Sequence, residues 1–195
     1  MIARYALLTS AAFAACAAWA QPNLTAATTV PSAGSDFQVN TYPSYLSAGS
    51  AGTDQTYEHW NMFAGTGAAQ NPGNQIIKYR DASVSSVASM IPSATLLSTD
   101  GGSDTLFWNV TSEGLEQVGS KTQFEGVLNF NDPSLELKLP ITYGDSWSDP
   151  TGDTYTISGI SVTRIGTISG VADAYGTLEL TSAVIYPEVL RVKVR

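Results

Sequence analysis

Three aspartates recur at every fourth position in one polar stretch of the chain. Asp145, Asp149 and Asp153 lie within residues 144–154, which are otherwise rich in serine, threonine and glycine. A loop dense in carboxylate and hydroxyl oxygens can hold calcium, which takes about six to eight oxygen ligands. The spacing differs from that of an EF-hand, and aspartate and serine also close turns through their own hydrogen bonds. We therefore expect a solvated turn here, with a calcium site as the alternative, and a second candidate of the same kind over residues 100–104.

The other residue types that carry catalysis are sparse. His59 is the only histidine, and no Gly-x-Ser-x-Gly motif marks a nucleophile for it to activate. The 17 acidic residues guarantee some carboxylate pairs in space, but nothing in their spacing selects two as the acid and base of a glycosidase. We predict that the chain is not an enzyme and needs no cofactor. A carboxylate-dependent glycoside hydrolase is the alternative.

Aromatic side chains suggest a different chemistry, because a flat ring can stack on the apolar face of a sugar. Trp147 lies between two serines in the polar stretch, and we expect it to be partly exposed. Together with Trp60 and Tyr143, it is the candidate platform of a carbohydrate-binding module. The competing interpretation is that large aromatics fill the core of a β-sandwich, as we expect for Trp108 in its alternating apolar segment.

The first twenty residues have the layout of a secretory signal peptide. Arg4 precedes an uncharged, mostly apolar run over residues 6–15, which is shorter than the ~20 residues of a transmembrane helix. Small residues then lead to a cleavage site between Ala20 and Gln21. We therefore expect an exported protein from which residues 1–20 are removed.

The single cysteine, Cys16, lies inside this signal peptide. Cleavage would leave 175 of the 195 residues without any cysteine, which excludes disulfides and cysteine ligands from the mature chain. The alternative is that Cys16 is lipidated and anchors the protein to a membrane.

Composition narrows the function classes further. The chain has 17 acidic and nine basic residues, and only 13% of its residues are charged. Removal of Arg4 with the signal peptide would leave eight basic residues and a net charge of −9. No basic patch can neutralise a run of phosphates, so we expect no nucleic-acid partner.

Apolar and polar residues alternate along much of the chain, as over residues 135–139 and 190–194. About a dozen such segments, separated by turn signals, predict an all-β fold of the antiparallel β-sandwich-like type, with an open β-barrel as the alternative. The only helix candidate is a single turn over residues 83–90. A bulge at Gly159 would keep the apolar residues on its two sides on one face. We expect residues 21–195 to form a single β domain.

Several phrases of the chain, taken together in their order, resemble a known group of proteins. They are Phe130-Asn131-Asp132-Pro133, residues 140–149, residues 166–178 and residues 189–193. They resemble the N-terminal β-rich domain of secreted Bacteroidetes proteins that carry a C-terminal type IX secretion sorting domain. The resemblance implies export as cargo of the type IX machinery, and it implies no catalytic residues. The chain ends at Arg195 without a sorting domain, so we expect either a truncated reading frame or a different export route.

These inferences converge on an exported, non-enzymatic β-domain that acts as an accessory or interaction module of a type IX cargo-like protein. We expect it outside the cell or on the outer cell surface, with a glycan or a protein as its ligand. Location in the periplasm, or anchoring through Cys16, is the alternative. A carbohydrate-binding module using Trp147, Trp60 and Tyr143 is the second functional hypothesis.

Overall fold

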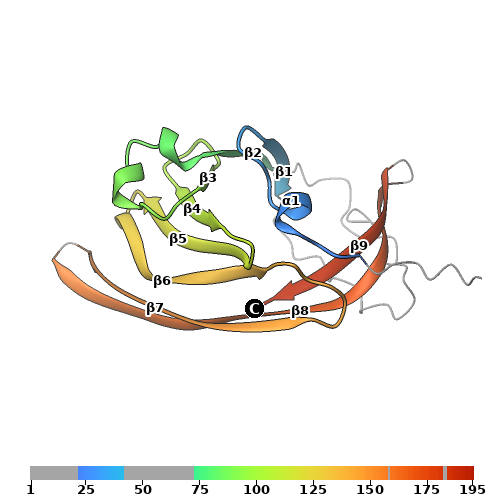
Figure 1. Ribbon diagram of the computed structural model, residues 1–195. Coiled ribbons are helices and arrows are strands. Elements are labelled where there is room, and N and C mark those ends of the chain that lie inside the picture. Colours follow the sequence, from blue (N-terminus) through green and yellow to red (C-terminus); the bar gives the residue numbers. More distant parts are fainter. Residues whose placement is uncertain (1–21, 42–72, 158, 182–183) are drawn as a thin grey trace, which may run out of the picture.

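The computed structural model describes residues 22–41, 73–157, 159–181 and 184–195 (Figure 1). Within these ranges the chain forms nine strands in two antiparallel sheets. The all-β, sandwich-like fold predicted from the alternation is confirmed, and the described strands do not close into a barrel. Residues 1–21 and 42–72, which contain the predicted cleavage site, Cys16, His59 and Trp60, lie outside the described residues.

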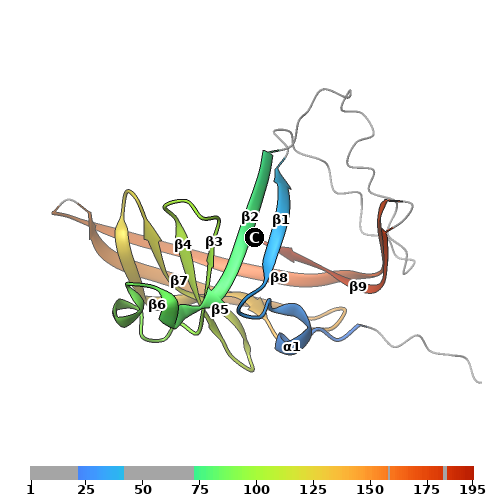
Figure 2. The ribbon, with the colours of Figure 1, turned by 90° about the horizontal axis from the view of Figure 1, so that it is seen from above.

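The first sheet is a six-stranded meander in which each strand pairs with the next one along the chain. Its strands are β1 (Asp36–Thr41), β2 (Gly73–Asp81), β3 (Leu96–Thr99), β4 (Thr105–Val110), β5 (Gly114–Thr122) and β6 (Gly126–Lys138). Of the residues of β2, only the last four, Lys78 to Asp81, pair with β3. The first half of β2 therefore pairs with β1 alone, and these two strands project from the sheet (Figure 2).

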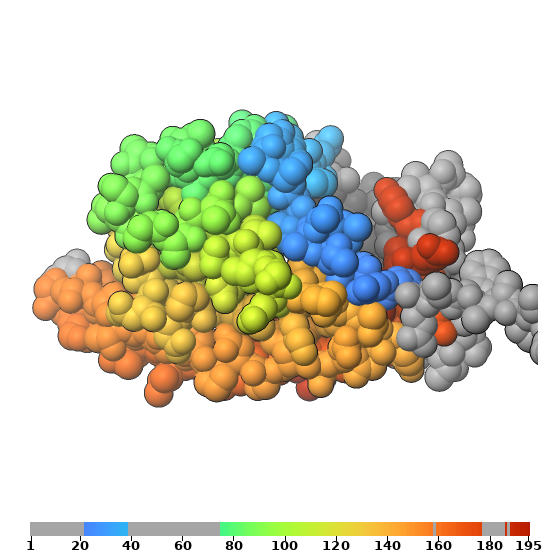
Figure 3. All heavy atoms as spheres, in the orientation of Figure 1, coloured from blue at the N-terminus to red at the C-terminus, as the bar shows by residue number. Residues whose placement is uncertain are grey.

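The second sheet has three strands, β7 (Ser146–Ile157), β8 (Ile160–Thr181) and β9 (Val184–Val194), with β8 at its centre. The long β8 pairs through its first half with β7 and through its second half with β9. In Figure 3 the orange atoms of β7 and its neighbours run along the lower side of the molecule, beneath the yellow atoms of β6. We call the side of this sheet that faces β6 its inner side and the opposite side its outer side.

The predicted bulge at Gly159 is wrong. The register between β7 and β8 is unbroken to the last pair, in which Ile157 lies opposite Ile160, and Tyr155 lies opposite Val162. Gly159 belongs instead to the tight turn between these strands, with a φ of 81° that favours glycine. The apolar residues keep to one face because the chain reverses direction.

Helical structure within the described residues is limited to short turns. The α-helix α1 covers Ala26–Thr29, and two 3₁₀ turns, η1 (Ala82–Val84) and η2 (Ala88–Met90), lie where one helical turn was expected. At η1 the side chain of Asp81 accepts a hydrogen bond from the backbone N–H of Ser83. No helix among the described residues has the length and apolar character needed to cross a membrane.

A first core cluster lies between the six-stranded sheet and the connection that contains η1 and η2. Its buried members are Ala82, Ile91, Leu97, Phe107 and Val118. The connection approaches the sheet so closely that a Cβ added to Gly119 would lie 2.9 Å from Cδ1 of Ile91. Burial of these side chains therefore fixes the connection on one face of β3, β4 and β5.

A second core cluster joins the two sheets. Leu139, Ile141, Trp147 and Ala172 are buried in it, and side chains of β6, β9 and the N-terminal segment pack around them. The N-terminal segment is held by two backbone hydrogen bonds of 3.0 Å between Leu24 and Ile141. The cluster lies on the inner side of the three-stranded sheet, which β6 and α1 cover.

Trp147 is at the centre of this second cluster, and the prediction that it is partly exposed is wrong. Its residue accessibility is only 9%, and its indole Nε1 donates a 3.0 Å hydrogen bond to the carbonyl oxygen of Leu135 in β6. The ring lies directly over Gly170 of β8, where an added Cβ would overlap it. One side chain of β7 thus lies over Gly170 of β8 and bonds to β6.

The absence of a side chain at position 170 should therefore matter to stability. We expect Gly170→Ala to lower the free energy of unfolding by about 1–3 kcal/mol, because the methyl group and the Trp147 ring cannot occupy the same space. Denaturant unfolding of the two proteins measures this difference.

Gly166→Ala is the matched control. Gly166 lies on the same strand and the same side, but the nearest side-chain atom to an added Cβ there is 3.9 Å away. We expect a change within about 0.5 kcal/mol for this variant. Equal effects at the two positions would show that the Trp147 ring does not require Gly170.

Candidate functional site

The three aspartates singled out by the sequence do not form a loop. Strand β7 begins at Ser146, so Asp149 and Asp153 belong to a strand and only Asp145 precedes it. Side chains alternate between the two sides of a strand, and both strand aspartates lie on the inner side with Trp147. The expectation of a solvated turn through residues 144–154 is therefore wrong for all but its first residues.

Asp149 binds the backbone of the neighbouring sheet. Its Oδ2 accepts a 2.7 Å hydrogen bond from the N–H of Leu135, the residue whose carbonyl accepts from Trp147. Two inward side chains of β7 thus satisfy both backbone groups of one residue of β6. A buried backbone group without a partner would cost about 1–3 kcal/mol, so this carboxylate has a structural role.

Further side chains continue this connection along both strands. Oδ1 of Asp153 accepts from Nδ2 of Asn131 at 3.1 Å, and Asp153 is buried to 7% exposure. Oδ2 of Asp132 accepts from the N–H of Gly152 at 2.9 Å, while the hydroxyl of Thr151 donates to the carbonyl of Asp132 at 3.2 Å. We call these contacts, with those of Trp147 and Asp149, the β6–β7 joint.

Two prolines help to explain why β6 and β7 are joined by side chains and not as paired strands. Pro133 lies in β6, and Pro150 lies in β7. The N–H groups of Gly152 and Thr154 bond to side chains of aspartates, so the even-numbered N–H positions of β7 point away from β8. Pro150 shares this parity and has no N–H to donate, which is typical of an edge strand.

Asp145 does close a turn. Its Oδ2 accepts hydrogen bonds from the N–H of Thr142 at 2.9 Å and from the hydroxyl of the same residue at 3.1 Å. These two bonds hold the pKa of Asp145 below its usual value, and the bond from the backbone N–H has the larger effect. Across the residues that the structure describes, no three histidine, cysteine or acidic side chains are grouped as metal ligands.

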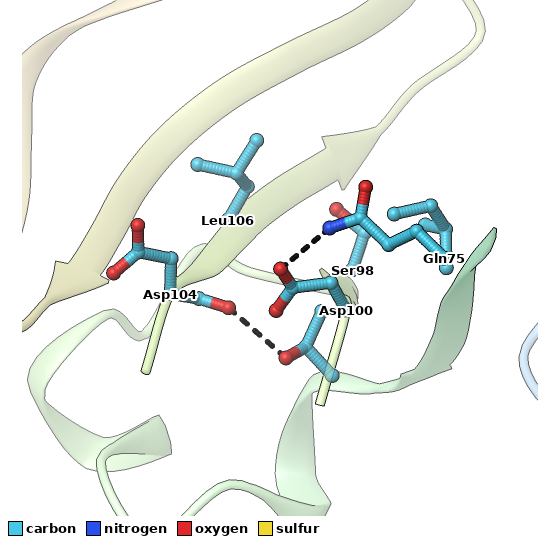
Figure 4. Close-up of a pocket in the computed structure, with 7 residues that line it drawn as sticks. Gln75, Ser98, Asp100, Asp104 and Leu106 are labelled. Carbon is cyan, nitrogen blue, oxygen red and sulfur yellow. Dashed lines mark hydrogen bonds between the residues drawn. The ribbon is translucent and has the colours of Figure 1, made fainter. Parts of the chain in front are cut away.

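The second acidic candidate lines a shallow pocket on the six-stranded sheet (Figure 4). The pocket has a volume of about 260 Å³, and it is lined by Gln75, Ile77, Ser98, Thr99, Asp100, Asp104 and Leu106. The carboxylate of Asp100 accepts from the N–H of Gly102 at 2.7 Å and from Nε2 of Gln75 at 2.6 Å. These bonds lower the pKa of Asp100, and the bond from Gly102 has the larger effect. Asp100 thus stabilises its own turn and the first part of the neighbouring strand β2.

The aromatic candidates are not brought together as a platform. Trp147 is buried, and Trp60 lies outside the described residues. Tyr143 is 45% exposed, and its ring packs edge-on against that of Tyr175 with 5.1 Å between the centroids. Of the three candidates, Tyr143 alone is shown to present a ring to solvent.

The outer side of the β7–β8 hairpin carries a set of residues that the sequence analysis missed. We call it the hydroxyl face, because serine and threonine occupy most of its positions. They are Ser146, Ser148, Thr154 and Thr156 of β7 and Ser161, Thr163, Thr167 and Ser169 of β8. All but Ser169 are exposed, and none of the outward residues of these two segments is charged. The signal was present as alternating hydroxyl residues, as in Ser146-x-Ser148 and Thr154-x-Thr156.

Cross-strand register aligns these hydroxyl residues in pairs. Ser148 lies opposite Ser169, and Thr154 lies opposite Thr163. The hydroxyl oxygens of the second pair are 3.1 Å apart, at hydrogen-bond distance. The exposed Ile165, with 84% of its surface accessible, interrupts the polar positions between these pairs.

One end of the hydroxyl face is basic. Arg191, Lys193 and Arg195 alternate along the last part of the chain, on the outer side. Asp173 of β8 bonds to Arg191 at 2.8 and 3.1 Å and to Nζ of Lys193 at 2.5 Å. A hollow of about 370 Å³ lies here, next to Ser146 and the other residues at this end of the hairpin. We call this region the basic end.

The three aspartates bind different partners, and this predicts how the Tm depends on calcium. We expect the same Tm in chelator and in millimolar calcium, because Asp145, Asp149 and Asp153 each bind a different partner. A site saturated at a hundred times its Kd would instead add about 2.7 kcal/mol and raise the Tm by roughly 5–10 °C. Such a rise, absent with magnesium, would contradict this assignment.

The ion pairs of Asp173 predict a dependence of stability on pH. Hydrogen bonds from Arg191, followed by those from Lys193, hold the pKa of Asp173 below its ordinary value of 3.8. A carboxyl with a lowered folded-state pKa stabilises the protein fully above its ordinary pKa, and this contribution is lost as the pH falls through the folded-state value. We expect Asp173→Asn to be less stable than the wild type by about 1.5–3 kcal/mol between roughly pH 5 and 7.

This difference should shrink below about pH 4, where the wild-type carboxyl becomes protonated as well. Unfolding by urea at a series of pH values measures it. Asp104→Asn is the control, because Asp104 is exposed and forms no ion pair within the described ranges. A difference that stays constant to pH 2.5 would show that the charge of Asp173 does not stabilise the fold.

Comparison with known proteins gives no relative from which a function could be transferred. No protein-family model matches the chain, and no match is found among curated proteins or solved structures. The geometry of the chain itself must therefore support any proposal about its function.

Proposed function

We propose that the chain is an exported, non-enzymatic interaction module that binds a polysaccharide through the hydroxyl face. The signal-peptide pattern of residues 1–20 supports export. The resemblance to type IX cargo proteins supports a position outside the cell or on its surface, with the secretion machinery as a transient partner.

The observation that carries the proposal is the hydroxyl face itself. Seven of its serine and threonine side chains are exposed on one side of a two-stranded segment that carries no charge there. A hydroxyl donates one hydrogen bond and accepts others, so a row of them matches a partner that is itself rich in hydroxyls. Hydroxyls also cost less to desolvate than charged groups do, which favours contact over solvation alone.

The use of the acidic residues supports a role without catalysis. Asp149 and Asp153 accept hydrogen bonds within the β6–β7 joint, and Asp145 accepts them within its turn. Carboxylates that serve as acid and base in a glycosidase must instead face the bound sugar from both sides. Of the two expected ligands, a glycan and a protein, the hydroxyl face favours the glycan.

A charge placed on the hydroxyl face tests the proposal. The double variant Thr154→Glu/Thr163→Glu puts two carboxylates at one cross-strand pair, and we expect it to weaken binding at least about tenfold. Affinity electrophoresis in gels that contain neutral or acidic polysaccharides measures the binding. Ser89→Glu/Ser93→Glu is the matched control, because both serines are exposed on the connection over the other sheet.

Retardation of the wild type that the control retains and the double variant loses supports the proposal. Failure of every polysaccharide in the panel to retard the wild type contradicts it, as does equal retardation of the double variant. Turnover of a polysaccharide that is lost on substitution of one acidic residue would contradict the non-enzymatic role.

A further inference from the structure

The distribution of positive charge on the three-stranded sheet is uneven. The chain has only nine basic residues, and three of them, Arg191, Lys193 and Arg195, alternate on the outer side at one end. The hydroxyl face that leads away from them over β7 and β8 has no charged residue. An anionic group that approaches this acidic protein is therefore attracted to this side of the sheet at the basic end.

The cations of the basic end exceed their acidic partner. Asp173 bonds to both Arg191 and Lys193. Arg195 has no ion pair within the described part of the chain, and its position is fixed by two backbone hydrogen bonds with Ser169, of 2.8 and 2.9 Å. Three basic side chains and one acidic side chain therefore lie together in this region.

The hollow at the basic end has the size and lining for one acidic sugar. It has a volume of about 370 Å³, and its lining includes Ser146, Ser169, Lys193 and Arg195, together with Asp173, whose carboxylate is bonded to Lys193. The guanidinium group of an arginine is a planar fork that matches the carboxylate of an acidic sugar. Serine hydroxyls can form hydrogen bonds with the hydroxyl groups of the same sugar. Asp173 and Arg191 already form such a pair in this region, at 2.8 and 3.1 Å.

We propose that the basic end binds the carboxylate of a uronic acid in an acidic polysaccharide, while neighbouring sugars lie along the hydroxyl face. The inference rests on the proposed function and names its partner. A nucleic acid fits less well, because its phosphates follow one another at intervals of about 1.7 Å along the duplex. Most of the contact surface here is uncharged, as suits a polymer with sparse charge and many hydroxyls.

The test compares two polymers that differ only in the carboxylate. Polygalacturonate and its methyl ester share one backbone, and affinity electrophoresis of the whole protein measures binding to each. We expect retardation by polygalacturonate and at least about tenfold weaker retardation by the ester. Dextran and dextran sulfate form a second pair, in which the sulfated form carries dense charge without carboxylates.

The variant Lys193→Gln/Arg195→Gln should lose about tenfold or more in affinity for polygalacturonate. Lys121→Gln/Lys138→Gln is the matched control, because it removes the same charge from the other sheet. Arg195→Gln alone breaks no ion pair within the described ranges, so it separates lost binding from a disturbed fold. We expect this single variant to weaken binding by a smaller factor while its Tm stays unchanged.

Equal binding of polygalacturonate and its ester overturns the inference, as does equal loss in the control variant. Binding of dextran sulfate in preference to polygalacturonate also overturns it, because bulk charge would then decide affinity. If neutral polymers bind as tightly as polygalacturonate and Thr154→Glu/Thr163→Glu abolishes this binding, the proposed function stands while the uronic acid inference fails. If no polymer binds, both fail.

Discussion

The contact of the Trp147 indole with Gly170 and Leu135 is the interaction on which the rest of the structure depends. The ring occupies the space that a side chain at position 170 would need, and its N–H bonds to a carbonyl at the edge of the other sheet. Asp149 completes this contact by accepting from the N–H of Leu135. Because Pro133 and Pro150 weaken backbone pairing at this edge, these side-chain bonds determine how β6 lies over β7.

This contact also determines which surface remains for a partner. Side chains alternate along β7, so the inward direction of Trp147, Asp149 and Asp153 requires the serines and threonines between them to point outward. The constraint that removes the predicted platform and calcium ligands from the surface is therefore the one that creates the hydroxyl face. Within this strand, residues of the joint and residues of the hydroxyl face occupy alternate positions.

Much of the fold could be predicted from sequence, because alternation is a local property. The pattern over residues 135–139 and 190–194 gave strands β6 and β9. The composition of the stretch from Ser146 to Asp153 favours a turn, because proline, glycine and short polar residues are typical of loops. This stretch is a strand because it pairs with β8 and contacts Leu135. Both interactions involve residues outside the stretch, so its own composition does not indicate them. Burial of Trp147 is equally non-local, since its neighbours were themselves polar.

The basic end follows from the same alternation, and one acidic residue contributes to its order. Arg191 and Lys193 would repel each other and fluctuate on an open sheet if no anion lay between them. The register shift between Ala172 and Ala174 leaves Asp173 as an extra residue of β8, and its side chain bonds to both cations. Asp173 lowers the net charge of the basic end by one, yet it holds two long side chains in place before the proposed carboxylate would bind. Fixed cations lose less conformational entropy on binding than free ones. Asp173 therefore weakens the positive potential of the basic end but preorganises its cationic side chains.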